Sequence, residues 1–123
     1  QDERGWIDDD AVEAVARVFN LSRAEVRGLV AFYADFRTRA PATHSLAICQ
    51  AEACQAAGSR ELTRLVCERV GTELGEQNAA GSVGVDPVYC LGLCARGPAM
   101  IVDGRLVVEA DRVVDDVLAE LER

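Results

Sequence analysis

The chain has 123 residues, of which 50% are hydrophobic and 28% are charged, with a net charge of −8. This balance is typical of a globular domain and excludes disordered and low-complexity proteins. Because the surface is acidic and no basic cluster offsets it, we expect no binding to nucleic acid. No apolar run approaches the ~20 residues of a membrane-spanning helix and no leader pattern opens the chain, so we expect a soluble, cytoplasmic protein without membrane contact.

Two amphipathic helices are expected at the N-terminal end. Three acidic residues at positions 8–10 favour the positive end of a helix that Asn20 can close. Ser22 and Glu25 have the spacing of a capping box, and the helix that they begin carries an apolar stripe at positions 26, 29, 30 and 33. Pro41 then marks a break. We therefore expect an N-terminal helical segment over residues 1–40 and a second domain over residues 41–123.

The second domain alternates strands with helices. Apolar runs predict strands over residues 46–49, 85–90, 99–102 and 105–108, and amphipathic patterns predict helices over residues 59–70 and from Asp111, which would cap the last helix. The polar residues 75–84 are predicted to form turns. Pro87 favours an edge position for its strand, because proline cannot donate a backbone hydrogen bond. Asp103-Gly104 is the signal of a type I′ hairpin turn. This order predicts an α/β fold, a thioredoxin-like mixed four-stranded sheet with flanking helices.

Five cysteines are the most informative feature of the sequence. An odd number without a secretory signal favours metal or redox chemistry over a disulfide framework. Cys49-x4-Cys54 follows the first strand and Cys90-x3-Cys94 follows the second. Because the carboxyl ends of parallel strands meet at one edge of a sheet, four sulfurs should converge there.

Four convergent thiolates can hold zinc or an iron–sulfur cluster. Zinc sites prefer a C-x2-C turn, so the wider spacings favour a cluster, in which each pair holds a different iron. Gly92 and Gly97 would let the backbone approach the sulfurs, and Leu91 and Leu93 would shield them from water. Two alternatives stay open from the residues alone, a zinc-stabilised interaction module and a dithiol enzyme, although the latter lacks a C-x-x-C motif.

Three further residues have simpler interpretations. Cys67 is expected to be a half-buried core residue, since a free cysteine packs like a hydrophobic side chain. His44 is expected in a surface loop before the first strand. Arg96 is either a cation that stabilises a negative site beside it or a solvated loop arginine. No G-x-G-x-x-G motif or P-loop is present, so we expect no nucleotide site and no catalytic site on this chain.

The motifs resemble those of the thioredoxin-like 2Fe–2S subunits of NADH-oxidising complexes, related to the 24-kDa subunit of respiratory complex I. The resemblance is carried by residues 26–36 (VRGLVAFYADF), the two cysteine pairs and residues 86–99 (DPVYCLGLCARGPA). It implies one 2Fe–2S cluster ligated by Cys49, Cys54, Cys90 and Cys94, two to each iron. It also implies a larger partner subunit that holds FMN and the NADH site, and a further helix before Gln1.

The run over residues 86–99 is similar, more narrowly, to the gamma subunit of soluble NAD-dependent formate dehydrogenases. Relatives in complex I more often carry an acidic residue where this chain has Ala95. The resemblance therefore favours an electron-transfer subunit of formate dehydrogenase. The equivalent subunit of respiratory NADH:quinone oxidoreductase, or of an NAD-linked hydrogenase, is the alternative.

Overall fold

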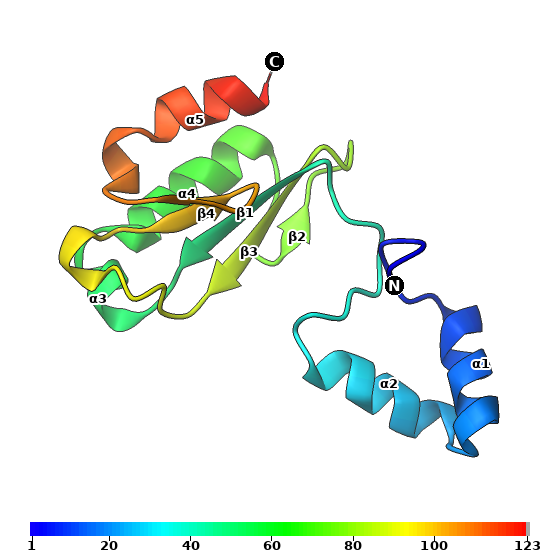
Figure 1. The fold of residues 1–123 in the computed structure, drawn as a ribbon. Coiled ribbons are helices and arrows are strands. Elements are labelled where there is room, and N and C mark those ends of the chain that lie inside the picture. Colours follow the sequence, from blue (N-terminus) through cyan, green and yellow to red (C-terminus); the bar gives the residue numbers. More distant parts are fainter. Residues whose placement is uncertain (123) are drawn as a thin grey trace. The chain divides into compact units, whose positions relative to one another are not determined.

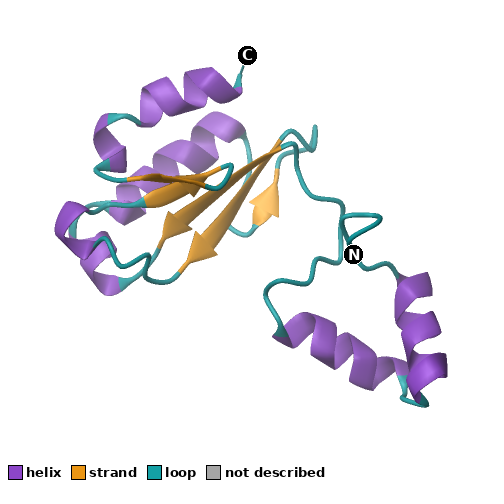
Figure 2. Cartoon of the chain, in the orientation of Figure 1, coloured by secondary structure: helices purple, strands orange, loops and turns teal. Residues whose placement is uncertain are grey.

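A computed structural model describes residues 1–122 of the chain, which form two compact units that divide after Pro41 (Figure 1). No helix in this range is long and apolar enough to cross a membrane. Figure 2 shows where the helices and strands lie. In chain order the elements are α1 Asp9–Phe19, α2 Arg23–Phe32, β1 His44–Cys49, α3 Glu52–Ala56, α4 Ser59–Val70, β2 Glu76–Gln77, β3 Val83–Val88, the 3₁₀ turn η1 Cys94–Arg96, β4 Met100–Val102, β5 Arg105–Val107, the 3₁₀ turn η2 Ala110–Arg112 and α5 Val114–Leu121.

The N-terminal unit is a pair of helices, in which the predicted caps at Asn20 and at Ser22 and Glu25 are joined by a further cap at Asp8. The Asp8 side chain accepts a hydrogen bond from the Ala11 amide at 2.8 Å, and Asn20 ends α1 in the left-handed conformation. Both hydrogen bonds of the predicted capping box between Ser22 and Glu25 are present. The two helices share a small core of Val12, Ala16 and Val26. The predicted stripe of α2 is narrower than expected, because Leu29 and Tyr33 remain about half exposed, at 50% and 53%.

The second unit is built on a five-stranded mixed sheet in the order β2-β3-β1-β4-β5. β1 runs parallel to β3 and antiparallel to β4, and both outer pairs are antiparallel. The prediction of four strands was wrong by one, because Glu76–Gln77 pairs with Val85 and Gly84 of β3. Two residues are too few to show the alternation by which a strand is recognised in a sequence.

Pro87 lies in β3, an inner strand of the sheet, but at this position no strand pairs with β3 on the side of β2. The carbonyls of Val83 and Val85 both accept hydrogen bonds from the side of β2, from Asn78 and Gly75. Backbone groups alternate along a strand, so the Pro87 nitrogen faces that same side. The pairing with β2 ends at Val85, which means that Pro87 meets no strand that needs a donor there.

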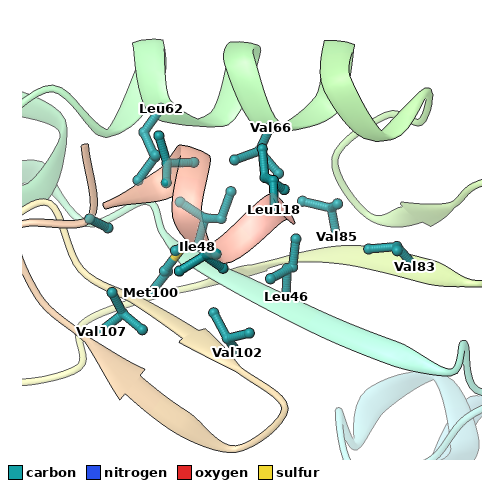
Figure 3. Close-up of a cluster of buried hydrophobic side chains, with 13 residues drawn as sticks. Leu46, Ile48, Leu62, Val66, Val83, Val85, Met100, Val102, Val107 and Leu118 are labelled. Carbon is teal, nitrogen blue, oxygen red and sulfur yellow. The ribbon is translucent and has the colours of Figure 1, made fainter. Parts of the chain in front are cut away.

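The main hydrophobic core lies between one face of the sheet and the helices α4 and α5 (Figure 3). Leu46 and Ile48 of β1 point into it, as do Val85 and Met100 from the neighbouring strands. α4 has the predicted bounds and ends at Gly71, whose φ of 74° is left-handed. The residues that complete this core are Leu62, Val66, Val83, Val102, Val107, Ala110, Val114, Val117 and Leu118.

Three local details test the remaining predictions. The hairpin between β4 and β5 has positive φ at both turn residues, 47° at Asp103 and 82° at Gly104, which confirms the type I′ turn. Between the predicted strand that ends at Cys49 and the predicted helix 59–70, the chain forms the short helix α3, which was not among the predicted elements. Asp111 does not cap the last helix, because it lies inside η2, and α5 begins after Val113 without a side-chain cap.

Substituting Leu46 by alanine should lower the free energy of unfolding by about 2–5 kcal/mol, because the side chain is fully buried and leaves a cavity. Urea denaturation followed by circular dichroism measures the change. Leu106 is the matched control, since it is 56% exposed on the edge strand β5 of the same sheet, and Leu106→Ala should change stability by less than about 1 kcal/mol. Equal losses in the two variants would contradict this placement of the core.

Candidate metal centre

The parallel pairing of β1 with β3 brings the two cysteine-bearing loops to one edge of the sheet. Cys49 is the last residue of β1 and is in register with Val88, the last residue of β3. Its amide donates to the Ala99 carbonyl at 3.0 Å, and the Gln50 amide donates to the Val88 carbonyl at 2.8 Å. The loop that follows β3 and the helix α3 that follows β1 therefore lie at the same end (Figure 1).

The first pair of cysteines is buried. Cys49 ends β1, whereas Cys54 lies in α3. The two residues are 1% and 2% exposed, and they pack with Ala99 in a small cluster separate from the main core. A Cβ atom on Gly97 would lie 3.3 Å from the Cβ of Ala57 and 3.5 Å from the sulfur of Cys54. The absence of a side chain at Gly97 thus lets the backbone of the second loop approach Cys54 closely, as expected from the sequence.

The second pair faces solvent. Cys90 and Cys94 are both exposed, and Cys94 begins the 3₁₀ turn η1. The loop between them turns sharply, with left-handed φ values of 68° at Cys90 and 73° at Gly92. A non-glycine residue adopts that conformation at a cost of roughly 1 kcal/mol. Cys90 therefore occupies a strained position next to the buried pair.

Backbone amides of both loops point at the buried sulfurs. Burial raises the pKa of the Cys49 thiol, but hydrogen bonds from the Ala51 amide, the Cys54 thiol and the amides of Cys90 and Leu91 outweigh it, so the net pKa is lowered. Burial raises the pKa of Cys54, and the nearby thiols of Cys49 and Cys94 add to that rise against a hydrogen bond from the Ala99 amide. The amide donors are positioned to stabilise a negative charge on Cys49.

Apolar side chains surround these sulfurs. Leu91 and Leu93, which flank Gly92 in the second loop, pack against the cluster of Cys49, Cys54 and Ala99. The two leucines therefore shield the buried pair, as predicted, whereas Cys90 and Cys94 remain exposed. Burial and amide hydrogen bonds to sulfur are the features by which a protein sets the potential of an iron–sulfur centre.

A buried hydroxyl group is hydrogen-bonded to the backbone of the first cysteine loop. Ser59, the first residue of α4, is fully buried, and its Oγ donates a hydrogen bond to the carbonyl of Cys49. Thr63 accepts from the Gln50 side chain at 2.8 Å and donates to the Ser59 carbonyl at 2.8 Å, while Gln55 donates to the Gln50 carbonyl at 2.7 Å. Nothing in the sequence signals this network, since a serine at a helix start indicates only a cap.

The four cysteines are gathered at one edge without forming a preorganised site for a single ion. Within residues 1–122, no three His, Cys, Asp or Glu side chains surround a common point closely enough to hold one metal ion. All five cysteines are free thiols. The donor set nevertheless suits an iron–sulfur cluster, because two pairs of thiols from two loops lie beside amide donors that already point at sulfur.

The other residues singled out in the sequence lie elsewhere. Cys67 is partly buried against the main core, as predicted, and burial and the charge of Glu73 raise its pKa. His44 is the first residue of β1 rather than a loop residue, and its Nδ1 lies 2.8 Å from the Asp103 carboxylate. Arg96 lies in η1 and pairs with Glu109 at 3.4 Å.

A mixed α/β unit with cysteines at one end of its parallel strand pair defines the class of the protein. The family model of the thioredoxin-like [2Fe-2S] ferredoxins matches residues 1–122. The chain belongs to this family, which confirms the predicted fold class and assigns it one 2Fe–2S cluster in preference to the zinc and dithiol alternatives.

Two curated relatives are named as subunits of oxidoreductases. The chain is similar to a subunit of the NADH-quinone oxidoreductase of Pseudomonas aeruginosa, 29% identical over 84% of this chain and 62% of that protein. It is also similar to a subunit of the NADH-quinone oxidoreductase of Thermus thermophilus, 32% identical over 89% of this chain and 60% of that one. The chain thus spans about 60% of the length of these curated relatives.

Solved structures support the fold. An NAD⁺-reducing [NiFe]-hydrogenase in the air-oxidised state matches 97% of this chain and 22% of its own, with a TM-score of 0.73 and 22% identity. The thioredoxin-like [2Fe-2S] ferredoxin of Aquifex aeolicus matches 66% of this chain and 87% of its own, with a TM-score of 0.52 and 19% identity. At these identities the likeness concerns the fold alone.

Substituting Ser59 by alanine should destabilise the loop of Cys49 and Cys54. The buried carbonyl of Cys49 would lose its hydroxyl donor, at a cost of about 1–3 kcal/mol in the free energy of unfolding. Chemical denaturation measures that loss, and the rate at which a chelator removes iron from the loaded protein should rise in parallel. Ser45→Ala, at an exposed serine of β1, the strand that ends at Cys49, is the matched control and should leave both quantities unchanged.

Proposed function

We propose that Cys49, Cys54, Cys90 and Cys94 ligate the 2Fe–2S cluster, two cysteines to each iron, and that the chain is a one-electron carrier. The observation that carries this assignment is the convergence of two cysteine pairs at one edge of the sheet in a member of this family. Each loop contributes one pair, and the two pairs differ in exposure. The bound cluster would supply reversible transfer of single electrons.

The surrounding residues would stabilise the negative charge that a reduced site carries. The amides of Ala51, Cys90 and Leu91 donate to Cys49, and the Ala99 amide donates to Cys54. Leu91 and Leu93 exclude water from the buried side. Removal of water strengthens the interaction of the amide dipoles with sulfur, because the local dielectric constant falls.

The carrier is proposed to work beside a flavin in a larger, NAD(H)-linked complex. NADH gives up two electrons together as a hydride, so a flavin is needed to pass them singly to an iron–sulfur centre. The sequence carries no nucleotide-binding motif, and the FMN and NAD sites are therefore assigned to a partner subunit. The relatives named as subunits of NADH-quinone oxidoreductases support this assignment.

The complex is more narrowly proposed to be a soluble NAD-dependent formate dehydrogenase, in which this chain would be the gamma subunit. Support comes from the run over residues 86–99 and from Ala95 after the last cysteine. An NADH-quinone oxidoreductase or an NAD⁺-reducing hydrogenase is the competing assignment, since these are the names of similar proteins.

Single cysteine-to-serine substitutions test the ligand assignment. Each of Cys49→Ser, Cys54→Ser, Cys90→Ser and Cys94→Ser should cause loss of most of the iron and acid-labile sulfide. The paramagnetic signal that appears on reduction with dithionite should weaken or change its g-values, because a hydroxyl is a poorer ligand to iron than a thiolate.

Cys67→Ser is the matched control and should retain full iron, sulfide and signal, because Cys67 lies against the core on α4. A protein that stays coloured after Cys54→Ser but is bleached by Cys67→Ser would overturn the assignment. One zinc per chain with no sulfide would do so as well.

The native complex tests the finer assignment. The chain should co-purify, under gentle conditions, with a flavin-containing subunit, and the preparation should reduce NAD⁺ with formate. Reduction of NAD⁺ with hydrogen, or oxidation of NADH by quinone without any formate activity, would replace formate dehydrogenase by one of the other two complexes.

A further inference from the structure

Residues 109–110 are hydrogen-bonded to the loop that follows Cys94. The Glu109 amide donates to the Arg96 carbonyl at 2.9 Å, and the Ala110 amide donates to the Pro98 carbonyl at 2.9 Å. These two bonds join the residues just after β5 to the residues just after the last cysteine. The position of the second loop therefore depends on a segment remote from both cysteine pairs in sequence.

Glu109 makes this contact in a strained backbone conformation. Its φ and ψ are 48° and 43°, in the left-handed region. Asn20 and Asp103 also have positive φ, but both are residue types that tolerate this region, one at a helix end and one in a hairpin turn. A glycine at position 109 would give the same backbone without strain. A glycine, however, would lack the carboxylate of the glutamate side chain.

That side chain bridges two arginines. Oε2 of Glu109 lies 3.4 Å from the guanidinium of Arg96, and Oε1 lies 3.3 Å from that of Arg112. The side chain of Glu109 is 39% exposed, and those of Arg96 and Arg112 are 63% and 72% exposed. Exposed pairs of this kind contribute little to folding stability. The pair instead places a positive charge at Arg96, two residues beyond Cys94, with the negative charge of Glu109 beside it.

We propose that Glu109 offsets the charge of Arg96 in the second cysteine loop, and that the net charge of this pair sets the reduction potential of the site. The inference rests on the proposed ligand assignment. One-electron reduction, with dithionite as the electron donor in the experiment, makes the site more negative by one charge. A nearby cation favours that step and a nearby anion opposes it.

The two partners must then act in opposite directions. Glu109→Gln leaves Arg96 uncompensated and should shift the midpoint potential upward. Arg96→Gln leaves Glu109 uncompensated and should shift it downward. In the double variant the two shifts should largely cancel, and each single shift should shrink between low and high ionic strength because the groups are partly exposed. Redox titration of the cluster-loaded full chain, followed by its paramagnetic signal, measures all three.

Two variants separate charge from structure. Glu109→Gly relieves the backbone strain and keeps the amide donor to Arg96, so a purely structural role predicts a wild-type potential, whereas the proposal predicts the same upward shift as Glu109→Gln. Glu120→Gln is the matched control, because Glu120 pairs with Arg105 at 3.3 Å and is 59% exposed. It makes the same change in net charge toward the opposite end of β5 from the cysteines and should leave the potential near that of the wild type.

The proposal is overturned if Glu109→Gln shifts the potential no more than Glu120→Gln does, or if Arg96→Gln shifts it in the same direction as Glu109→Gln. Failure of the ligand assignment has a different signature, which is an unchanged iron content and an unchanged paramagnetic signal after Cys94→Ser. The charge variants are measured by a shift in a cluster that they retain, so the two failures are distinguishable.

Discussion

The parallel pairing of β1 with β3 is the constraint on which the candidate centre depends. Parallel strands need a crossover, and here α3 and α4 supply it on the way to β3. Both strands therefore end at one edge, and the register places Cys49 opposite Val88, two residues before Cys90. The main core stabilises this pairing, since Leu46, Ile48 and Val85 are fully buried beneath the helices. Packing on one face of the sheet thus determines where sulfur atoms meet at its end.

The elements predicted from the sequence are those whose signal is local. Ser22 and Glu25 form their capping box, Gly71 ends α4, and Asp103-Gly104 turns the hairpin, because each depends on backbone conformations within a few residues. Cysteine spacing after two strands predicted the shared edge because strand direction follows from the crossover. Membership of the ferredoxin family confirms the cofactor that this geometry suggested.

What the sequence did not reveal depends on partners remote along the chain. β2 is two residues long and exists because β3 offers it an open edge. Ser59 is buried because it faces the carbonyl of Cys49, and its residue type alone signals nothing of that. Asp111 has the residue type of a cap, yet the chain first forms η2 there, where the amides of Glu109 and Ala110 bond to the cysteine loop. A tertiary hydrogen bond has overridden a local preference.

The unequal burial of the two cysteine pairs follows from how each loop is held. Cys49 and Cys54 lie on a strand end and a helix that the Ser59 network fixes to α4, so the fold itself encloses their sulfurs. Cys90 and Cys94 lie on a loop shaped by left-handed turns and attached through Arg96 and Pro98. This exposed pair would place one side of the proposed centre close to the protein surface. The network of Ser59 therefore fixes one half of the proposed ligand set to α4, while the amide of Glu109 attaches the half that faces outward through the Arg96 carbonyl.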